Sequence, residues 1–269
     1  MTLLAGIIAP HPPILIPQVG GEFFDSLKAT AAALNRASNL LDEVGVEALI
    51  VTSPHSPLFK DQFVIRFDER FEADFEQFGA VEPRFMYEND VAMAQTLAVA
   101  ALRGGVPLHA WEVPDGSIDW GVSVPCSYLG KNRQIISVSI STLSYEDHYL
   151  LGQKLAESLA LTKKRFAFVA SGDLSHRLTP DAPNGFSPRG LEFDQLICEI
   201  VADGRLADLK TIDAELIESA GECGLRSFII MAGALSKAKV ETKVLSYEGP
   251  FGVGYLVATM LVKDGEANV

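Results

Sequence analysis

Short apolar segments of strand length alternate with longer helical segments through most of this 269-residue chain. The strand candidates are Leu3–Ala9, Ala48–Thr52, Phe63–Phe67, Leu108–Val113, Gln134–Ser139, Phe166–Ala170, Thr242–Ser246 and Gly254–Leu261. The helix candidates are Phe23–Val44, Asp90–Arg103, Tyr145–Leu159, Leu191–Ala202 and Gly224–Ala238. This alternation is typical of an α/β fold, because a crossover between parallel strands usually needs a helix. We therefore expect α/β/α layers around a largely parallel, mixed central sheet, with residues 1–269 forming a single domain.

The composition argues against several classes of partner. The formal net charge is −13, with 22 Lys and Arg against 35 Asp and Glu, so the chain lacks the basic surface that nucleic acid or an anionic membrane requires. No apolar segment approaches the roughly 20 residues of a membrane-spanning helix. Three cysteines, Cys126, Cys198 and Cys223, are too few for a disulfide framework. We expect a cytoplasmic protein that binds neither nucleic acid nor membranes.

Three of the five histidines directly follow predicted strands. His11 follows the first strand in the segment APHPP, His55 follows the second in SPHSP, and His176 follows a later strand in SGDLSH. Ligands bind at the carboxyl ends of parallel strands, so these histidines can converge on one crevice. The flanking prolines restrict the backbone of the first two loops, which suits a metal or reaction centre. His109 and His148 lie within predicted elements, and we expect them to be structural or surface residues.

The third, anionic ligand of a metal held by two imidazoles is ambiguous from spacing alone. Glu222 is one candidate, but the pattern Ser219-x-x-Glu222 before an apolar segment is also a helix capping box. Cys223 beside it is either a ligand or a small buried residue. Asp173 either caps the turn after its strand, or orients His176 or a metal ligand through a hydrogen bond.

Taken together, these segments resemble the class III extradiol ring-cleavage dioxygenases, in particular the catalytic β-subunit of protocatechuate 4,5-dioxygenase, and the Memo-like proteins of the same superfamily. The resemblance runs through most of the chain. It depends on five segments in this order: PHPP from residue 10, SPHSP from residue 53, GDLSH from residue 172, GECGLR from residue 221 and FGVGY from residue 251.

The resemblance implies one extradiol dioxygenase-like domain that uses Fe(II) and O₂ to cleave a catechol-like ring, giving a semialdehyde of the muconate type. His11, His55 and Glu222 are the implied iron ligands. His176 is the implied catalytic acid and base, a role that suits an imidazole near neutral pH, and we assign Asp173 to the catalytic set beside it. Relatives often form homo-oligomers or pair with a small second subunit, and either assembly is open here.

Two departures from the dioxygenase pattern leave an alternative open. Trp120 stands where members of the family often have an active-site His; Trp cannot accept a proton, and we expect it to line the substrate site. Cys223 stands beside Glu222, and Memo-like members carry Cys in this region. If Cys223 is the ligand, Zn or Cu becomes the expected metal, with a redox or interaction role and no ring cleavage. An inward-facing Glu222 would favour the dioxygenase; a Glu222 that caps its helix beside an inward Cys223 would favour the Memo-like alternative.

Overall fold

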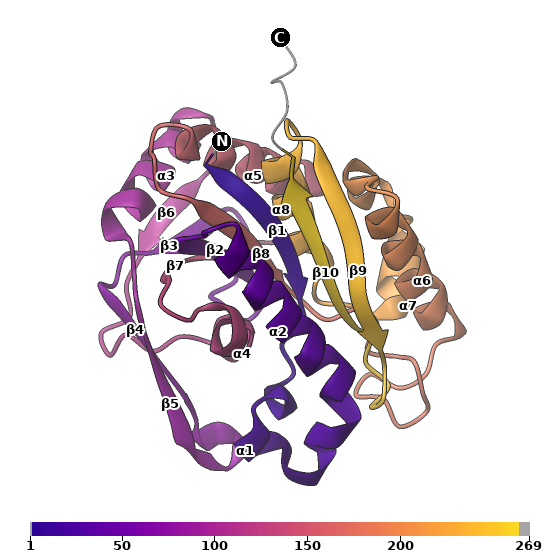
Figure 1. Ribbon diagram of the computed structural model, residues 1–269. Coiled ribbons are helices and arrows are strands. Elements are labelled where there is room, and N and C mark those ends of the chain that lie inside the picture. The colour runs from indigo at the N-terminus through magenta and orange to yellow at the C-terminus, as the bar shows by residue number, and fades with distance from the viewer. Residues whose placement is uncertain (1, 264–269) are drawn as a thin grey trace.

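The computed structural model of the chain describes residues 2–263 (Figure 1). The strands are β1 (Leu3–Ala9), β2 (Ala48–Ser53), β3 (Phe63–Arg66), β4 (Arg70–Phe75), β5 (Ala80–Glu88), β6 (Leu108–Trp111), β7 (Gln134–Ser139), β8 (Phe166–Ser171), β9 (Val240–Glu248) and β10 (Tyr255–Val262). The α-helices are α1 (Pro17–Gly20), α2 (Lys28–Glu43), α3 (Val91–Arg103), α4 (Trp120–Leu129), α5 (Tyr145–Leu159), α6 (Pro188–Ala202), α7 (Ala214–Ala220) and α8 (Leu225–Leu235). Short 3₁₀ segments precede or follow some of these elements.

Eight of these strands form one mixed sheet in the order β6-β3-β7-β2-β8-β1-β10-β9. In the centre of the sheet, β2 pairs parallel with both β7 and β8, and β8 pairs parallel with β1. β10 and β9 add antiparallel pairs at one end, and β3 pairs antiparallel with β7 near the other. The expected mixed, largely parallel sheet is therefore confirmed, and β2, β8 and β1 bring their carboxyl ends to the same edge.

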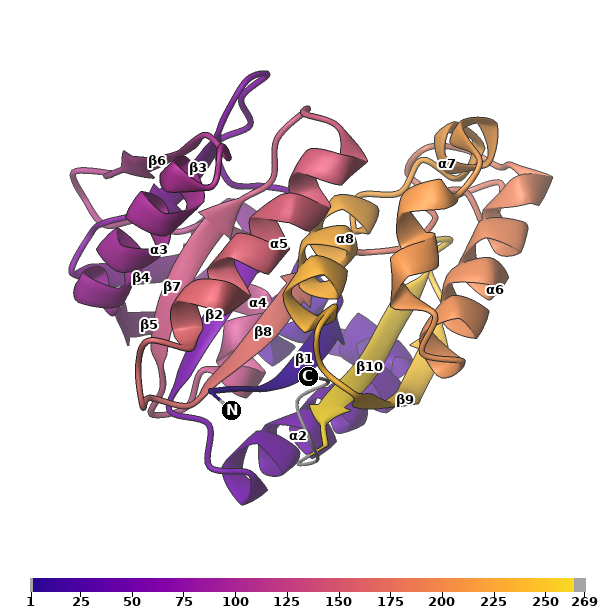
Figure 2. The same ribbon diagram turned by 90° about the horizontal axis from the view of Figure 1, so that it is seen from above.

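Helices cover both faces of this sheet and bury a separate apolar core against each. Residues of β1, β2 and β8 alternate between the two cores, as the period of a strand requires. One core lies beneath α3, α5, α6 and α8, and the other beneath α2 and α4. Figure 2 shows α3, α5 and α8 side by side on the first face and α2 on the opposite one. Within residues 2–263, each helix is too short or too polar to cross a bilayer.

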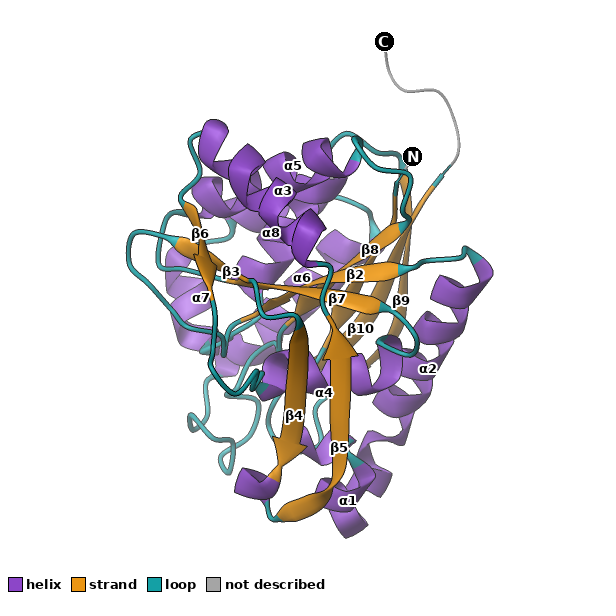
Figure 3. Cartoon of the chain, turned by 90° about the vertical axis from the view of Figure 1, so that its left-hand side faces the viewer, coloured by secondary structure: helices purple, strands orange, loops and turns teal. Residues whose placement is uncertain are grey.

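Several expected elements keep their boundaries almost unchanged, and a few were missed. Asp90 and Ser144 accept hydrogen bonds at the N-termini of α3 and α5, as their positions predicted. The expected helix from Phe23 begins only at Lys28, after a 3₁₀ segment. Helices α4 and α7 and the β4–β5 hairpin are not among the predicted elements. Figure 3 shows this hairpin as a separate ribbon beside α4, where its buried side chains join the α2/α4 core.

Candidate metal centre

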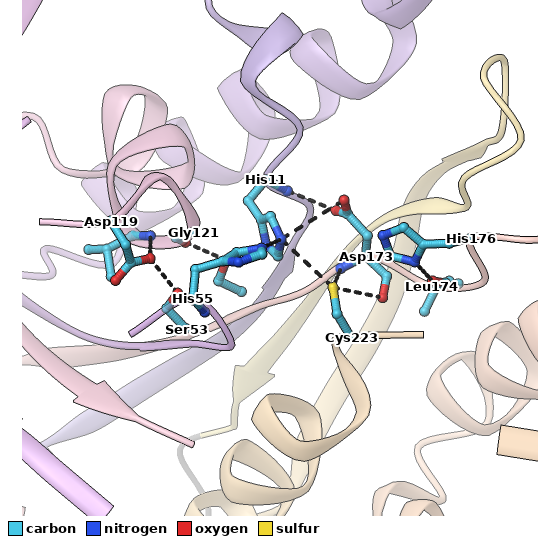
Figure 4. Close-up of polar contacts among 11 residues, drawn as sticks. His11, Ser53, His55, Asp119, Gly121, Asp173, Leu174, His176 and Cys223 are labelled. Carbon is cyan, nitrogen blue, oxygen red and sulfur yellow. Dashed lines mark hydrogen bonds and ion pairs between the residues drawn. The ribbon is translucent and has the colours of Figure 1, made fainter. Parts of the chain in front are cut away.

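Two histidines meet where two parallel strands of the sheet end. His11 lies two residues after β1, and His55 lies two residues after β2. β8 separates these strands in the sheet, and Asp173 follows its last residue by two positions. The Nε2 atoms of His11 and His55 are 3.0 Å apart, and the rings meet edge to face (Figure 4). The expected convergence of these loops is thus present in the structure.

His11 is held so that Nε2 faces the centre. The residue is 2 % exposed, and its Nδ1 contacts Ser171 Oγ at 2.9 Å. Ser171 donates its hydroxyl proton to the carbonyl of Gly121, so its oxygen accepts from His11 Nδ1–H. This assignment leaves a lone pair on Nε2 of the neutral ring. Burial lowers the pKa of His11 to about 3, which keeps the ring neutral and able to bind a metal.

His55 is more exposed and is held mainly by the loop that carries it. Its backbone N–H donates to Ser53 Oγ at 3.1 Å. Ser53 and Ser56 donate their hydroxyl protons to the two oxygens of Asp119, at 2.5 and 2.7 Å. The imidazole lies over the ring of Trp120, with the centroids 4.0 Å apart. Burial, with a further contribution from His11, lowers the pKa of His55 to about 4.

Asp119 is a further residue of the site that is not among the predicted site residues. Its carboxylate also accepts the backbone N–H of Val122, so one side chain both caps α4 and fixes the His55 loop. Gly121 is necessary for this arrangement, because a Cβ there would lie 2.2 Å from Ser53 Oγ. An Asp directly before an apolar segment is an N-cap signal, and it could have located both α4 and Asp119.

Cys223 reaches the same centre from the loop before α8. Its Sγ lies 3.7 Å from His11 Nε2 and accepts the backbone N–H of Asp173 at 3.3 Å. Asp173 Oδ1 accepts the backbone N–H of His11, and Oδ2 lies 4.0 Å from His11 Nε2. The ligand atoms of these three residues all lie within 4.8 Å of one another. The two loops approach closely because Gly172 packs directly on Gly224, where a Cβ would lie 2.1 Å from Cα.

Glu222 does not join this group. Its carboxylate accepts the backbone N–H of Leu225, the first residue of α8, at 2.6 Å. Glu222 therefore caps the N-terminus of α8. Ser219 lies within α7 and does not form the expected capping box with it. Because the N-terminus of α8 engages the carboxylate, the assignment of Glu222 as the anionic ligand stays a prediction that this contact does not favour. Burial raises the pKa of Glu222 to about 7, and the Leu225 N–H opposes this rise.

His176 lies beside the centre without joining the ligand group. Its Nδ1 contacts the carbonyl of Leu174 at 3.1 Å, and because a carbonyl only accepts, Nδ1 carries the proton in the neutral ring. Nε2 is then free to accept a proton. Asp173 contacts His11 and not His176, so of its expected roles the structure presents the one beside a metal ligand. Burial raises the pKa of Asp173 to about 6.

The remaining histidines and one cavity lie outside this centre. His148 is fully buried between Ser141 and Ser144, and His109 lies exposed on β6. An apolar cavity of about 450 Å³ opens between α5 and α8, beside Thr2 and Leu3 at the start of β1. It is therefore at the opposite end of the strand from His11.

Comparison with known proteins places this geometry in a family. Residues 5–258 match the family described as the catalytic LigB subunit of aromatic ring-opening dioxygenase. Protein CA_C1420 of Clostridium acetobutylicum is 28% identical over 267 residues, which cover 95% of this chain and 57% of that protein. The chain therefore spans little more than half the length of this relative.

Two further relatives carry names that state an activity. The 3,4-dihydroxyphenylacetate 2,3-dioxygenase of Escherichia coli is 25% identical, over 90% of this chain and 93% of the relative. The 2-aminophenol 1,6-dioxygenase beta subunit of a Pseudomonas species is 26% identical, over 99% of this chain and 97% of the relative. The crystal structure of the uncharacterized protein JW3007 from Escherichia coli K12 shares the fold, with a TM-score of 0.61, 18% identity and coverage of 96% of this chain and 99% of that one. On the family match, the chain belongs to the catalytic LigB subunits of aromatic ring-opening dioxygenases.

Proposed function

We propose that this chain is a metal-dependent extradiol dioxygenase that opens a catechol-type ring with O₂, and that Fe(II) is its metal. The observation that supports this most directly is the pair of imidazole Nε2 atoms 3.0 Å apart at the ends of β1 and β2. His176, with an available Nε2, lies beside them. We also propose that residues 1–269 form one domain around this site.

The donor set fits a divalent metal. His11 and His55 offer neutral imidazole nitrogens, while Cys223 and Asp173 can each supply one negative charge. Burial raises the pKa of both anionic candidates, so their ionised forms are costly without a nearby cation. A bound divalent ion would offset this cost. We propose His11 and His55 as ligands, with Asp173, which also accepts the His11 backbone N–H, or Cys223 as the anionic ligand. A carboxylate ligand suits Fe(II), whereas a thiolate ligand suits Zn or Cu.

A redox-active metal held there would supply Lewis acidity and a path for electrons from the aromatic ring to O₂. The protein's own residues do the rest. His176 accepts a phenolic proton at Nε2, and its Nδ1–H stays bonded to the Leu174 carbonyl. Trp120 is half-buried against His55 and offers an apolar ring face beside the site, which suits substrate binding but cannot transfer protons. The substrate class is a catechol-like or aminophenol-like aromatic, by analogy with the named relatives.

A second candidate function is Memo-like metal binding without ring cleavage. The specific observation in its favour is the orientation of the adjacent pair, since Cys223 faces His11 while Glu222 caps α8. A thiolate with imidazoles suits Zn or Cu better than a carboxylate does. The family match favours the dioxygenase, and the thiol favours this alternative.

One set of measurements separates the two candidates. Anaerobic titrations with Fe(II), Zn(II) and Cu(I) should be made on the wild type, Cys223→Ala and Glu222→Gln, with Cys198→Ala as the control for loss of a half-buried thiol elsewhere. Ring opening is then followed optically with 3,4-dihydroxyphenylacetate and 2-aminophenol under O₂. Fe(II) binding with ring opening supports the dioxygenase. Tight Zn(II) or Cu(I) binding lost only in Cys223→Ala, with no turnover of either compound, would replace it with the second candidate.

Assembly forms part of the same proposal. One relative is named as a beta subunit, so we propose that this chain works as a homo-oligomer or with a small second subunit. Sedimentation of the purified protein, alone and after co-purification from its native host, measures this directly. A monomer in both preparations would contradict the proposal.

A further inference from the structure

A buried carboxylate on α6 contacts the loop that carries His176. Asp194 is 0 % exposed, and its Oδ1 accepts the backbone N–H of Ser175 at 2.8 Å. Its Oδ2 accepts the phenolic O–H of Tyr247, on β9, at 2.7 Å. Both partners are uncharged donors, and each carboxylate oxygen of Asp194 accepts one of these hydrogen bonds. Burial raises the pKa of Asp194 to about 7, and the two donors oppose this rise.

The N–H that Asp194 accepts belongs to the same peptide group as the carbonyl that binds His176. The Leu174 carbonyl and the Ser175 N–H lie on opposite sides of one planar amide. The carbonyl accepts His176 Nδ1–H at 3.1 Å, while Asp194 accepts the N–H. The order is therefore carboxylate, peptide group, imidazole, and hydrogen bonds in such a chain polarise one another. Figure 4 shows the last of these contacts, from His176 to Leu174.

The surrounding backbone restrains this peptide group. Leu174 N–H donates to the carbonyl of Gly254, and Gly254 N–H donates to the carbonyl of Ser175. Ser175 Oγ and His176 N–H both donate to the carbonyl of Ala220. Gly254 also lets β10 approach the carboxylate, since a Cβ there would lie 2.0 Å from Asp194 Oδ2. Asp194 is thus the side chain that fixes the Ser175 amide within a loop otherwise held largely by backbone contacts.

We propose that Asp194 is a positioning residue for His176, which it orients and polarises through the Leu174–Ser175 peptide group. When ionised, which requires a pH above about 7, Asp194 increases the electron density on the Leu174 carbonyl and so strengthens its bond with His176 Nδ1–H. The proton is thereby kept on Nδ1, and Nε2 is left as the proton acceptor. The catalytic consequence rests on the proposed function; the tautomer of His176 does not.

The test compares Asp194→Asn with Tyr247→Phe. Asp194→Asn removes the charge while keeping an acceptor for Ser175, whereas Tyr247→Phe keeps both the charge and the Ser175 contact. Nitrogen-15 NMR of metal-free protein measures the Nδ1–H to Nε2–H ratio of neutral His176, and hydrogen exchange measures protection of the Ser175 amide. We expect Asp194→Asn to lower the tautomer ratio by ~3- to 10-fold and to speed exchange at Ser175 by ~10-fold, with Tyr247→Phe close to wild type. Asp194→Ser, a smaller neutral side chain, is the second variant if Asp194→Asn does not fold.

An unchanged tautomer ratio in both neutral variants, with only a lower melting temperature, would overturn the proposal. Equal effects in Tyr247→Phe and Asp194→Asn would also overturn it, because the charge would then be irrelevant. Zn(II) affinity should stay within ~2-fold of wild type in each variant, since Asp194 contacts none of the proposed ligands. If the wild-type enzyme opens no ring, the proposed function fails, while the NMR result on metal-free protein still decides the role of Asp194.

Discussion

Asp119 offers the sharpest test of how the second histidine is held, because one carboxylate supports two structures. It accepts the hydroxyl protons of Ser53 and Ser56 and the backbone N–H of Val122. In Asp119→Ala, the lost helix cap costs about 1 kcal/mol of unfolding free energy. Ser53 and Ser56 are both buried, and each unpaired hydroxyl adds about 1 kcal/mol. We therefore expect a total loss of about 3 kcal/mol.

The same substitution should weaken metal binding beyond its effect on stability. Ser53 Oγ accepts the backbone N–H of His55, so a Ser53 hydroxyl that has lost Asp119 holds the His55 loop less firmly. Loss of a partner that orients a metal ligand typically reduces affinity ~10- to 100-fold. Titration with Zn(II) or anaerobic Fe(II) measures the affinity, and urea unfolding of metal-free protein measures the stability.

Asp90→Ala is the matched control. Asp90 caps α3 by accepting the backbone N–H of Met93, and it also pairs with Lys164. Lys164 lies just before β8 and therefore at the other end of the sheet from the histidines. We expect about 1–2 kcal/mol of destabilisation and unchanged metal affinity. The proposed support of His55 would be refuted if Asp119→Ala bound metal as tightly as Asp90→Ala does.

Three further substitutions test the core and the approach of the loops. Burial lowers the pKa of His148 to about 4. Below pH 6.5 the unfolded state therefore binds one more proton at this residue than the folded state does. About 3 kcal/mol of unfolding free energy that is present above pH 6.5 is lost as the pH falls to about 4. His148→Gln should flatten this part of the urea-unfolding profile; an equal slope in both proteins would contradict the assignment. Gly172→Ala places a Cβ 2.1 Å from the Cα of Gly224, so both thermal stability and Zn(II) affinity should fall, and a variant with unchanged affinity would show that the contact is irrelevant to the site. Phe168→Ala removes a fully buried ring from the central strand β8 and should cost about 3–5 kcal/mol in urea unfolding, whereas a cost below about 1 kcal/mol would not fit the described core.

The parts of the fold that could be predicted are those whose signal is local. The runs that become β1, β2 and β8 are buried on both faces, so they read as continuous apolar segments without ambiguity. Asp90 and Ser144 are caps by residue type and position. The convergence of His11 and His55 followed from the rule that parallel strands present their carboxyl ends together.

The elements that were missed have a weaker or misleading local signal. β4 alternates three exposed charged residues with three buried apolar ones, and this period of two extends over only six residues. α4 is buried almost all round and has Pro125 in its interior, so it lacks both the helical stripe and a helix-forming composition. Both elements are stabilised by packing against distant parts of the chain, which a local pattern does not encode.

The choice between Glu222 and Cys223 depends on contacts of the same long-range kind. The two residues are adjacent in sequence, so a small rotation of the loop before α8 decides which side chain faces His11. That rotation is fixed by the packing of Gly172 on Gly224 and by the Asp173 carbonyl, which accepts the N–H of Gly224. The Glu222 carboxylate then accepts the N–H of Leu225, where the helix N-terminus stabilises a negative charge. The Asp173 N–H, which donates to Cys223 Sγ from 50 residues earlier in the chain, thus helps to hold the thiol and not the carboxylate toward His11. If a metal binds at this point, a thiolate favours softer metals than a carboxylate does.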